Sequence, residues 1–170
     1  MRRITIPPII AAALLLGGCS SPVGTAASTP AADAPFSTVP GPDGKPVTVP
    51  STLPEDCRHA FVQIGGPLMS AREGFKAMLV GASPADVTAG AERVVNAWSM
   101  LESPTVESAL LDCSSQSRNA GPAFRNAVEA VGSQHIAAGL VAGSGELPFP
   151  GRGNTSEALE LVETALAATT

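Results

Sequence analysis

Apolar residues recur every three or four positions along most of the chain after residue 52, which is the spacing of one face of an α-helix. No stretch in this region alternates apolar and polar residues at the two-residue period of a strand. The pattern predicts an all-α fold over residues 53–170, a small bundle of five to six short helices. The stretches that carry it are 53–66, 68–81, 83–101, 103–113, 121–140 and 154–168.

Local features mark where these helices begin and end. Proline disfavours the helical conformation in the residue before it, so Gly-Gly-Pro at 65–67 predicts a break. Ser-Pro at 83–84, and again at 103–104, places a capping hydroxyl directly before a proline at the first helical position. Asn154 with Glu157 three residues later has the spacing of a capping box, which predicts that the last helix begins there.

Residues 19–52 differ in composition from the rest of the chain. Seven prolines fall between positions 22 and 50, and Phe36 is the one aromatic side chain. Such a segment buries too little apolar surface to offset the entropy lost on ordering, so we predict a disordered Pro-rich spacer ahead of the domain. The alternative is a β-hairpin around Pro-Asp-Gly at 42–44, because short β-branched runs flank this turn sequence.

The first 18 residues have the layout of a secretory signal peptide. Arg2 and Arg3 precede an apolar run at 4–16, and two glycines follow it. The run holds about 13 residues, whereas a membrane-spanning helix needs roughly 20. We therefore expect the segment to direct export and to be removed.

The end of this segment is more specific. Leu16-Gly17-Gly18-Cys19 resembles the lipobox of bacterial lipoproteins, an aliphatic residue and two small residues before a cysteine. The resemblance implies cleavage before Cys19, a diacylglyceryl group on its thiol, and an exported protein anchored by lipid to the outer face of the cell membrane. The Ala- and Pro-rich composition likewise resembles that of small actinobacterial lipoproteins. The alternative is an ordinary secretory signal in which Cys19 has no role.

The other two cysteines, Cys57 and Cys113, lie on the apolar faces of separate predicted helices. With Cys19 modified by lipid, they form an even pair in an oxidising compartment, which predicts a Cys57–Cys113 disulfide. The competing interpretations are two buried thiols, or a metal site formed by both cysteines and His59. Thiolate metal sites have closely spaced ligand pairs, which this chain lacks, so we predict no metal or cofactor.

Charge and composition exclude some classes of partner. The chain has a net charge of −5, and loss of Arg2 and Arg3 with the signal peptide leaves 8 basic and 15 acidic side chains, a net charge of −7. A chain this acidic does not bind nucleic acid through charge. The expected partners are the membrane, through the anchor on Cys19, and an envelope protein or a small apolar ligand.

Candidate catalytic groups are few. His59 falls off the apolar face of its helix and is expected in solvent, whereas His135 falls on the apolar face of 121–140. A lone histidine on such a face is usually a hydrogen-bonded core residue, yet His135 is the best single candidate for a tuned group. No serine stands in a Gly-x-Ser-x-Gly motif.

The stretch 143–154 is rich in glycine but lacks the Gly-Lys-Ser/Thr ending of a phosphate loop. It predicts a long interhelix loop, in which Phe149 and Arg152 are candidates for partner or ligand contact. Trp98 and Met100 are predicted core residues.

Taken together, these features favour a non-enzymatic binding module that lipid holds in the cell envelope. The alternative is a carrier of a small apolar ligand, with a cavity around Phe61, Phe75, Trp98 and Phe124. A hydrolase that uses His135 is less favoured, because it needs a serine or carboxylate in contact with the imidazole.

Overall fold

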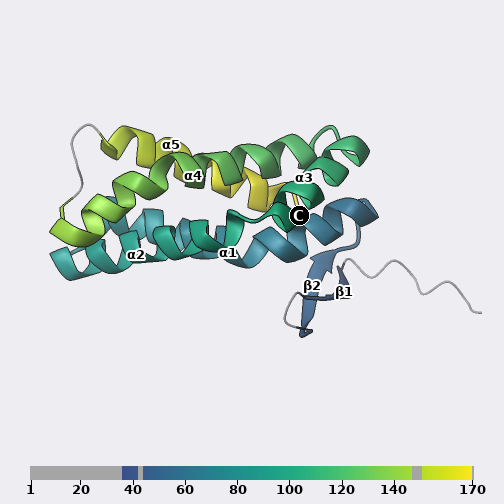
Figure 1. Ribbon diagram of the computed structural model, residues 1–170, viewed down its shortest axis with the longest axis horizontal. Coiled ribbons are helices and arrows are strands. Elements are labelled where there is room, and N and C mark those ends of the chain that lie inside the picture. The colour runs from purple at the N-terminus through teal and green to yellow at the C-terminus, as the bar shows by residue number, and fades with distance from the viewer. Residues whose placement is uncertain (1–35, 42–43, 147–150, 170) are drawn as a thin grey trace, which may run out of the picture. The chain divides into compact units, whose positions relative to one another are not determined.

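The structure, a computed structural model, describes residues 36–41, 44–146 and 151–169. These residues form a β-hairpin followed by five helices (Figure 1). The predicted signal peptide, Cys19, the spacer as far as residue 35, and Phe149 lie outside the described residues.

The elements follow one another along the chain with short connections. The strands are β1, Phe36–Pro40, and β2, Pro46–Pro50. The helices are α1, Glu55–Val80; α2, Pro84–Leu101; α3, Pro104–Gln116; α4, Ala120–Ser144; and α5, Gly151–Ala167. The predicted all-α bundle is confirmed for the described residues, although α1 and α4, with 26 and 25 residues, are longer than expected.

The four longer helices pack side by side in the cyclic order α1, α2, α4, α5, and α1 also touches α4 across the bundle (Figure 1). The short connection at 81–83 makes α1 and α2 antiparallel neighbours. Helix α3, with 13 residues, packs against α1 and α4. The fold is therefore a four-helix bundle with one additional shorter helix, α3, which lies between α2 and α4 in the sequence. No described helix combines the length and the apolar character that would let it cross a bilayer.

Small residues allow the helices of this core to approach closely. The largest fully buried side chains are Phe75 and Phe124, and many of the remaining core residues are alanine or valine. Where α1 meets α2, a Cβ added to Gly74 would lie 2.6 Å from the carbonyl oxygen of Gly90. The two backbones are thus in direct contact. The core is filled because the helices lie close together, and large side chains contribute less to it.

The predicted break at 65–67 is wrong, because α1 continues through Pro67. Proline in a helix removes one backbone hydrogen bond, and its ring crowds the Cβ of the residue before it. That preceding residue is Gly66, which has no Cβ, so this part of the steric penalty is absent. Residues on both sides of Pro67, including Ile64 and Leu68, are fully buried and hold the helix together by packing.

The two Ser-Pro helix starts are confirmed. The hydroxyl of Ser83 accepts a hydrogen bond from the backbone N–H of Asp86, and the hydroxyl of Ser103 accepts one from Val106, both at 3.2 Å. Each serine has an extended backbone, as an N-cap residue requires.

The capping box predicted at Asn154 is wrong, because α5 begins earlier, at Gly151. Asn154 is exposed within the first turns of the helix. Its neighbour Thr155 is buried, and the Thr155 hydroxyl donates to the carbonyl oxygen of Gly151 at 2.9 Å and lies 3.4 Å from Oε1 of Gln134 in α4. Contact with α4 therefore favours a helix that begins three residues before the start predicted at Asn154.

Two short segments of the predicted spacer, Phe36–Pro40 and Pro46–Pro50, instead form the strands of the alternative hairpin. Strands β1 and β2 pair antiparallel, with Phe36 opposite Pro50 and Pro40 opposite Pro46. Gly44 has a φ of +75°, which glycine adopts readily, and the side chain of Val49 is fully buried. Arg58 of α1 reaches the hydroxyl of Ser37 at 3.5 Å, so the hairpin packs on the first turns of α1.

The predicted disulfide between Cys57 and Cys113 is confirmed, with the two Cα atoms 4.3 Å apart. It joins the first turn of α1 to the last turn of α3. Because both sulfurs are consumed, the alternatives of free thiols and of a metal site through His59 are wrong.

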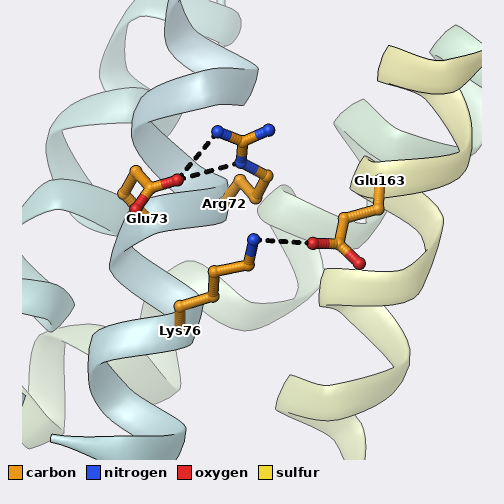
Figure 2. Close-up of polar contacts among 4 residues, drawn as sticks. All are labelled: Arg72, Glu73, Lys76 and Glu163. Carbon is orange, nitrogen blue, oxygen red and sulfur yellow. Dashed lines mark hydrogen bonds and ion pairs between the residues drawn. The ribbon is translucent and has the colours of Figure 1, made fainter.

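Among the described residues, one ion pair links two helices. Figure 2 shows Lys76 of α1 extended toward Glu163 of α5, with Nζ and Oε1 2.8 Å apart. Arg72 instead pairs with its neighbour Glu73 on the same helix, also at 2.8 Å. All four side chains are at least one-third exposed, so each pair contributes about 0–1 kcal/mol, and packing dominates.

Candidate binding groove

A groove of about 660 Å³ lies between the end of α2, the first two-thirds of α3 and the first half of α4. We call it the Trp98 groove. It is lined by Trp98, Leu101, Glu102, Ser103, Pro104, Val106, Glu107, Leu110, Leu111, Arg125, Val128 and Glu129.

The floor of the Trp98 groove is apolar. Val106 and Leu110 are buried against the core, Trp98 and Val128 are half-buried, and Leu111 is 57% exposed. A leucine this exposed beside further apolar side chains leaves a continuous apolar surface open to solvent. A groove of this volume with an apolar floor and a few polar groups at its rim has the general form of a ligand site.

The rim is charged. Glu102, Glu107, Glu129 and Arg125 are all exposed, and together they give the groove a local net charge of −2. The guanidinium of Arg125 donates to the hydroxyl of Ser114 at 3.1 Å. Within the described part of the chain, none of the three glutamates has an ion-pair partner.

Two residues of α4 position Trp98. A Cβ added to Gly132 would lie 2.6 Å from a ring carbon of Trp98, so the indole lies directly on the helix backbone. The imidazole of His135 stacks on the indole, with ring centroids 5.1 Å apart and an interplanar angle of 20°. Nδ1 of His135 forms a hydrogen bond with the carbonyl oxygen of Gly132, which fixes the imidazole in turn.

Helix α3 forms one wall of the groove and is held at both ends. The hydroxyl of Ser103 caps its first turn, and the disulfide at Cys113 attaches its last turn to α1. Near this end α4 approaches so closely that a Cβ on Gly121 would lie 2.5 Å from the Cα of Ser114. The wall is therefore fixed by covalent, capping and backbone contacts.

His135 does not have the contacts of a general base. It is half-buried on the apolar face, as expected. Its neighbours in the described structure are the Gly132 carbonyl and the Trp98 ring, and no hydrogen bond there joins it to a serine or a carboxylate. The geometry gives His135 a role in positioning Trp98.

The other predicted site residues are scattered. Arg152 donates to the carbonyl oxygen of Leu79 at 2.8 Å, which satisfies one of the last carbonyls of α1. His59 is exposed, as predicted. Met100 is 52% exposed, so its assignment to the core is wrong; it lies on the outer face of α2, away from the core residues Ala97 and Leu101.

Within the described residues, the three phenylalanines expected around a cavity pack against one another or against the core. Phe75 and Phe124 are fully buried, and the rings of Phe61 and Phe124 pack with centroids 5.9 Å apart. Of the four aromatic residues expected around that cavity, only Trp98 lines the groove. The apolar surface that is open to a ligand therefore lies outside the bundle.

A second groove was not anticipated from the sequence. About 570 Å³ between α1 and α3 is lined by residues that include Asp56, His59, Ser108 and Asp112. These are residue types of hydrolytic sites, but no hydrogen bond among the described residues joins His59 to the serine or to either aspartate. The groove thus lacks the mutual contacts that activate a nucleophile.

Nothing in the described ranges brings three histidine, cysteine or carboxylate side chains together as a metal site would. Comparison of the chain with protein-family models, with curated proteins and with solved structures gave no match. The choice of the Trp98 groove as the candidate functional site therefore rests only on its geometry and its lining residues.

Proposed function

We propose that the protein is an exported lipoprotein, anchored to the outer face of the cell membrane through Cys19, whose helical bundle acts as a non-enzymatic binding module. The lipobox-like sequence before Cys19 supports the anchor. The open apolar floor of the Trp98 groove, with Leu111 exposed at its edge, is the observation that supports binding.

The shape of the groove favours a partner over an enclosed small ligand. A carrier encloses most of its ligand's surface, which needs a cavity inside the bundle. The phenylalanines that would line such a cavity pack against each other or against the core. The carrier remains the second hypothesis, and a hydrolase using His135 is the third.

Photo-crosslinking in intact cells tests the proposal. A photoreactive amino acid replaces Leu111 in the groove or, as a matched control, Leu140, an equally apolar and exposed residue on α4 outside it. We expect a discrete protein adduct from position 111 that is absent from position 140. Equal capture from both positions, or none from position 111, would contradict the proposal, and adducts of lipid alone would favour the carrier.

A further inference from the structure

The rim of the Trp98 groove specifies more than apolar binding. We propose that the groove binds a short segment of a partner protein in which basic side chains flank an apolar one. This inference rests on the proposed function, since it names the partner chemistry for the same groove.

The floor accounts for the apolar part of such a segment. Leu110, Leu111 and Val128 come from two helices and face a volume that suits one or two large side chains and the backbone between them. Apolar area removed from water there supplies the main driving force.

The rim accounts for the basic part. Its three glutamates come from three places, Glu102 at the end of α2, Glu107 on α3 and Glu129 on α4, so negative charge surrounds the floor. Side chains that lack a partner in the described structure are available to pair with a ligand. Arg125, the one cation, is already engaged by Ser114 and offsets one of the three charges.

Trp98 adds a fixed aromatic surface to the groove, since α4 lies against the indole at Gly132 and the imidazole of His135 stacks on it. Because Gly132 and His135 hold the ring in place, little side-chain entropy is lost when a ligand contacts it.

The same charges argue against an anionic surface as the occupant. A phospholipid headgroup would bring its phosphate to a rim of three carboxylates, whereas a basic segment would be drawn to it. Charge complementarity therefore selects the basic, amphipathic segment.

Peptide titration of the full chain in non-ionic detergent tests the inference. The probes are a heptapeptide of alternating arginine and leucine, and counterparts with serine or glutamate in place of arginine. Trp98 is the one tryptophan of the chain, so its fluorescence reports binding. We expect saturable binding of the basic peptide that weakens with added salt, and weaker or no binding of the other two.

Two variants locate the charges. Glu107→Gln/Glu129→Gln should weaken binding of the basic peptide by about three- to tenfold, the effect of losing two exposed ion pairs. Glu92→Gln/Glu160→Gln removes the same charge from exposed positions outside the groove and should leave binding unchanged.

The outcomes separate the inference from the proposed function. If the neutral peptide binds as tightly as the basic one, the inference is overturned while binding in the groove stands. Tightest binding of the acidic peptide, through Arg125, would also overturn it. If no peptide changes the Trp98 fluorescence, the inference falls, and capture from position 111 in cells separately decides the proposed function.

Discussion

At the scale of single residues, the surface of the groove depends on two residues that do not line it, Gly132 and His135. Gly132 leaves room for the indole of Trp98 against α4, and His135 covers that indole and bonds to the carbonyl of Gly132. A change at either residue should therefore reach the groove through Trp98.

Replacing Gly132 with alanine should displace the Trp98 ring. The new Cβ would lie 2.6 Å from the ring, so we expect a loss of about 1–3 kcal/mol in the free energy of unfolding and a changed Trp98 emission spectrum. Gly139→Ala in the same helix is the control: its Cβ meets open space, and it should stabilise by up to about 1 kcal/mol. Equal effects of both variants on stability would show that the close contact is absent.

Replacing His135 with alanine should loosen Trp98 without removing it. We expect broader Trp98 emission and a loss of about 0.5–1.5 kcal/mol in the free energy of unfolding, the range for a stacked ring pair. His135→Phe keeps a ring stacked on Trp98, so it should restore most of the Trp98 emission spectrum and most of the free energy of unfolding. If His135 acted through proton transfer, phenylalanine would not rescue its role. His59→Ala, at an exposed position, should change neither.

At the scale of elements, the bundle depends on close helix contacts more than on large side chains. The backbone contact of Gly74 with Gly90 sets the distance between α1 and α2. The disulfide sets the position of α3, which packs on the bundle through fewer buried residues than any other helix.

Gly74→Ala should destabilise the protein strongly for a one-carbon change. The added Cβ would meet backbone, which cannot rotate away, so α1 and α2 must separate at a cost of about 1–3 kcal/mol. Urea unfolding measures the change. Gly153→Ala, in α5 with open space around it, is the matched control and should not destabilise.

Replacing the disulfide with Cys57→Ser/Cys113→Ser should lower the free energy of unfolding by roughly 4 kcal/mol, the chain-entropy value for a loop of about 57 residues. Because α3 loses its covalent attachment, amide hydrogen exchange should rise most over 104–116, and binding in the Trp98 groove should weaken. Unchanged exchange in α3 would mean that packing alone holds the wall.

The helical pattern and the caps were predictable because they are local. Apolar spacing located every helix, and the two Ser-Pro starts formed as their sequences indicate. The errors arose where tertiary contact outweighed local preference: burial of Ile64 and Leu68 carries α1 past Pro67, and contact of Thr155 with α4 extends α5. The Pro-rich composition of the hairpin segment predicts disorder. Burial of the Val49 side chain offsets the entropy that is lost when the segment is ordered.

The groove was less predictable than the fold, since α2, α3 and α4 contribute to it from positions separated by about 30 residues. Periodicity placed Trp98 and His135 on the inner faces of their helices. It could not show that the two rings stack on each other, because this depends on the relative positions of α2 and α4.

At the scale of the whole molecule, the proposed function needs both an anchor and a binding surface, and these lie in separate parts of the chain. Cys19 lies outside the described residues, 17 positions before β1 begins at Phe36. A change at Cys19 should therefore affect location without affecting the bundle.

Cys19→Ala, expressed in a bacterium with the signal sequence intact, should move the protein from the membrane fraction to the soluble or secreted fraction. The intact mass of the unchanged protein should exceed that of its polypeptide by a lipid group, whereas the variant should not. The thermal unfolding midpoints of the two should agree. A membrane-bound variant, or an unmodified Cys19 thiol in the parent protein, would contradict the anchor.

The position of the disulfide also determines how the protein bears mechanical load. A pull on the chain ahead of β1 reaches the bundle through the hairpin and the first turn of α1, where Cys57 is joined to Cys113. Force from a partner bound to α3 would pass to the first turn of α1 through the Cys57–Cys113 disulfide. It would not pass through the rest of α1 or through α2. The roughly 55 residues between the two cysteines cannot extend, which removes about 190 Å from the stretchable length of the chain. Under tension, the hairpin should therefore open first while the groove keeps its shape.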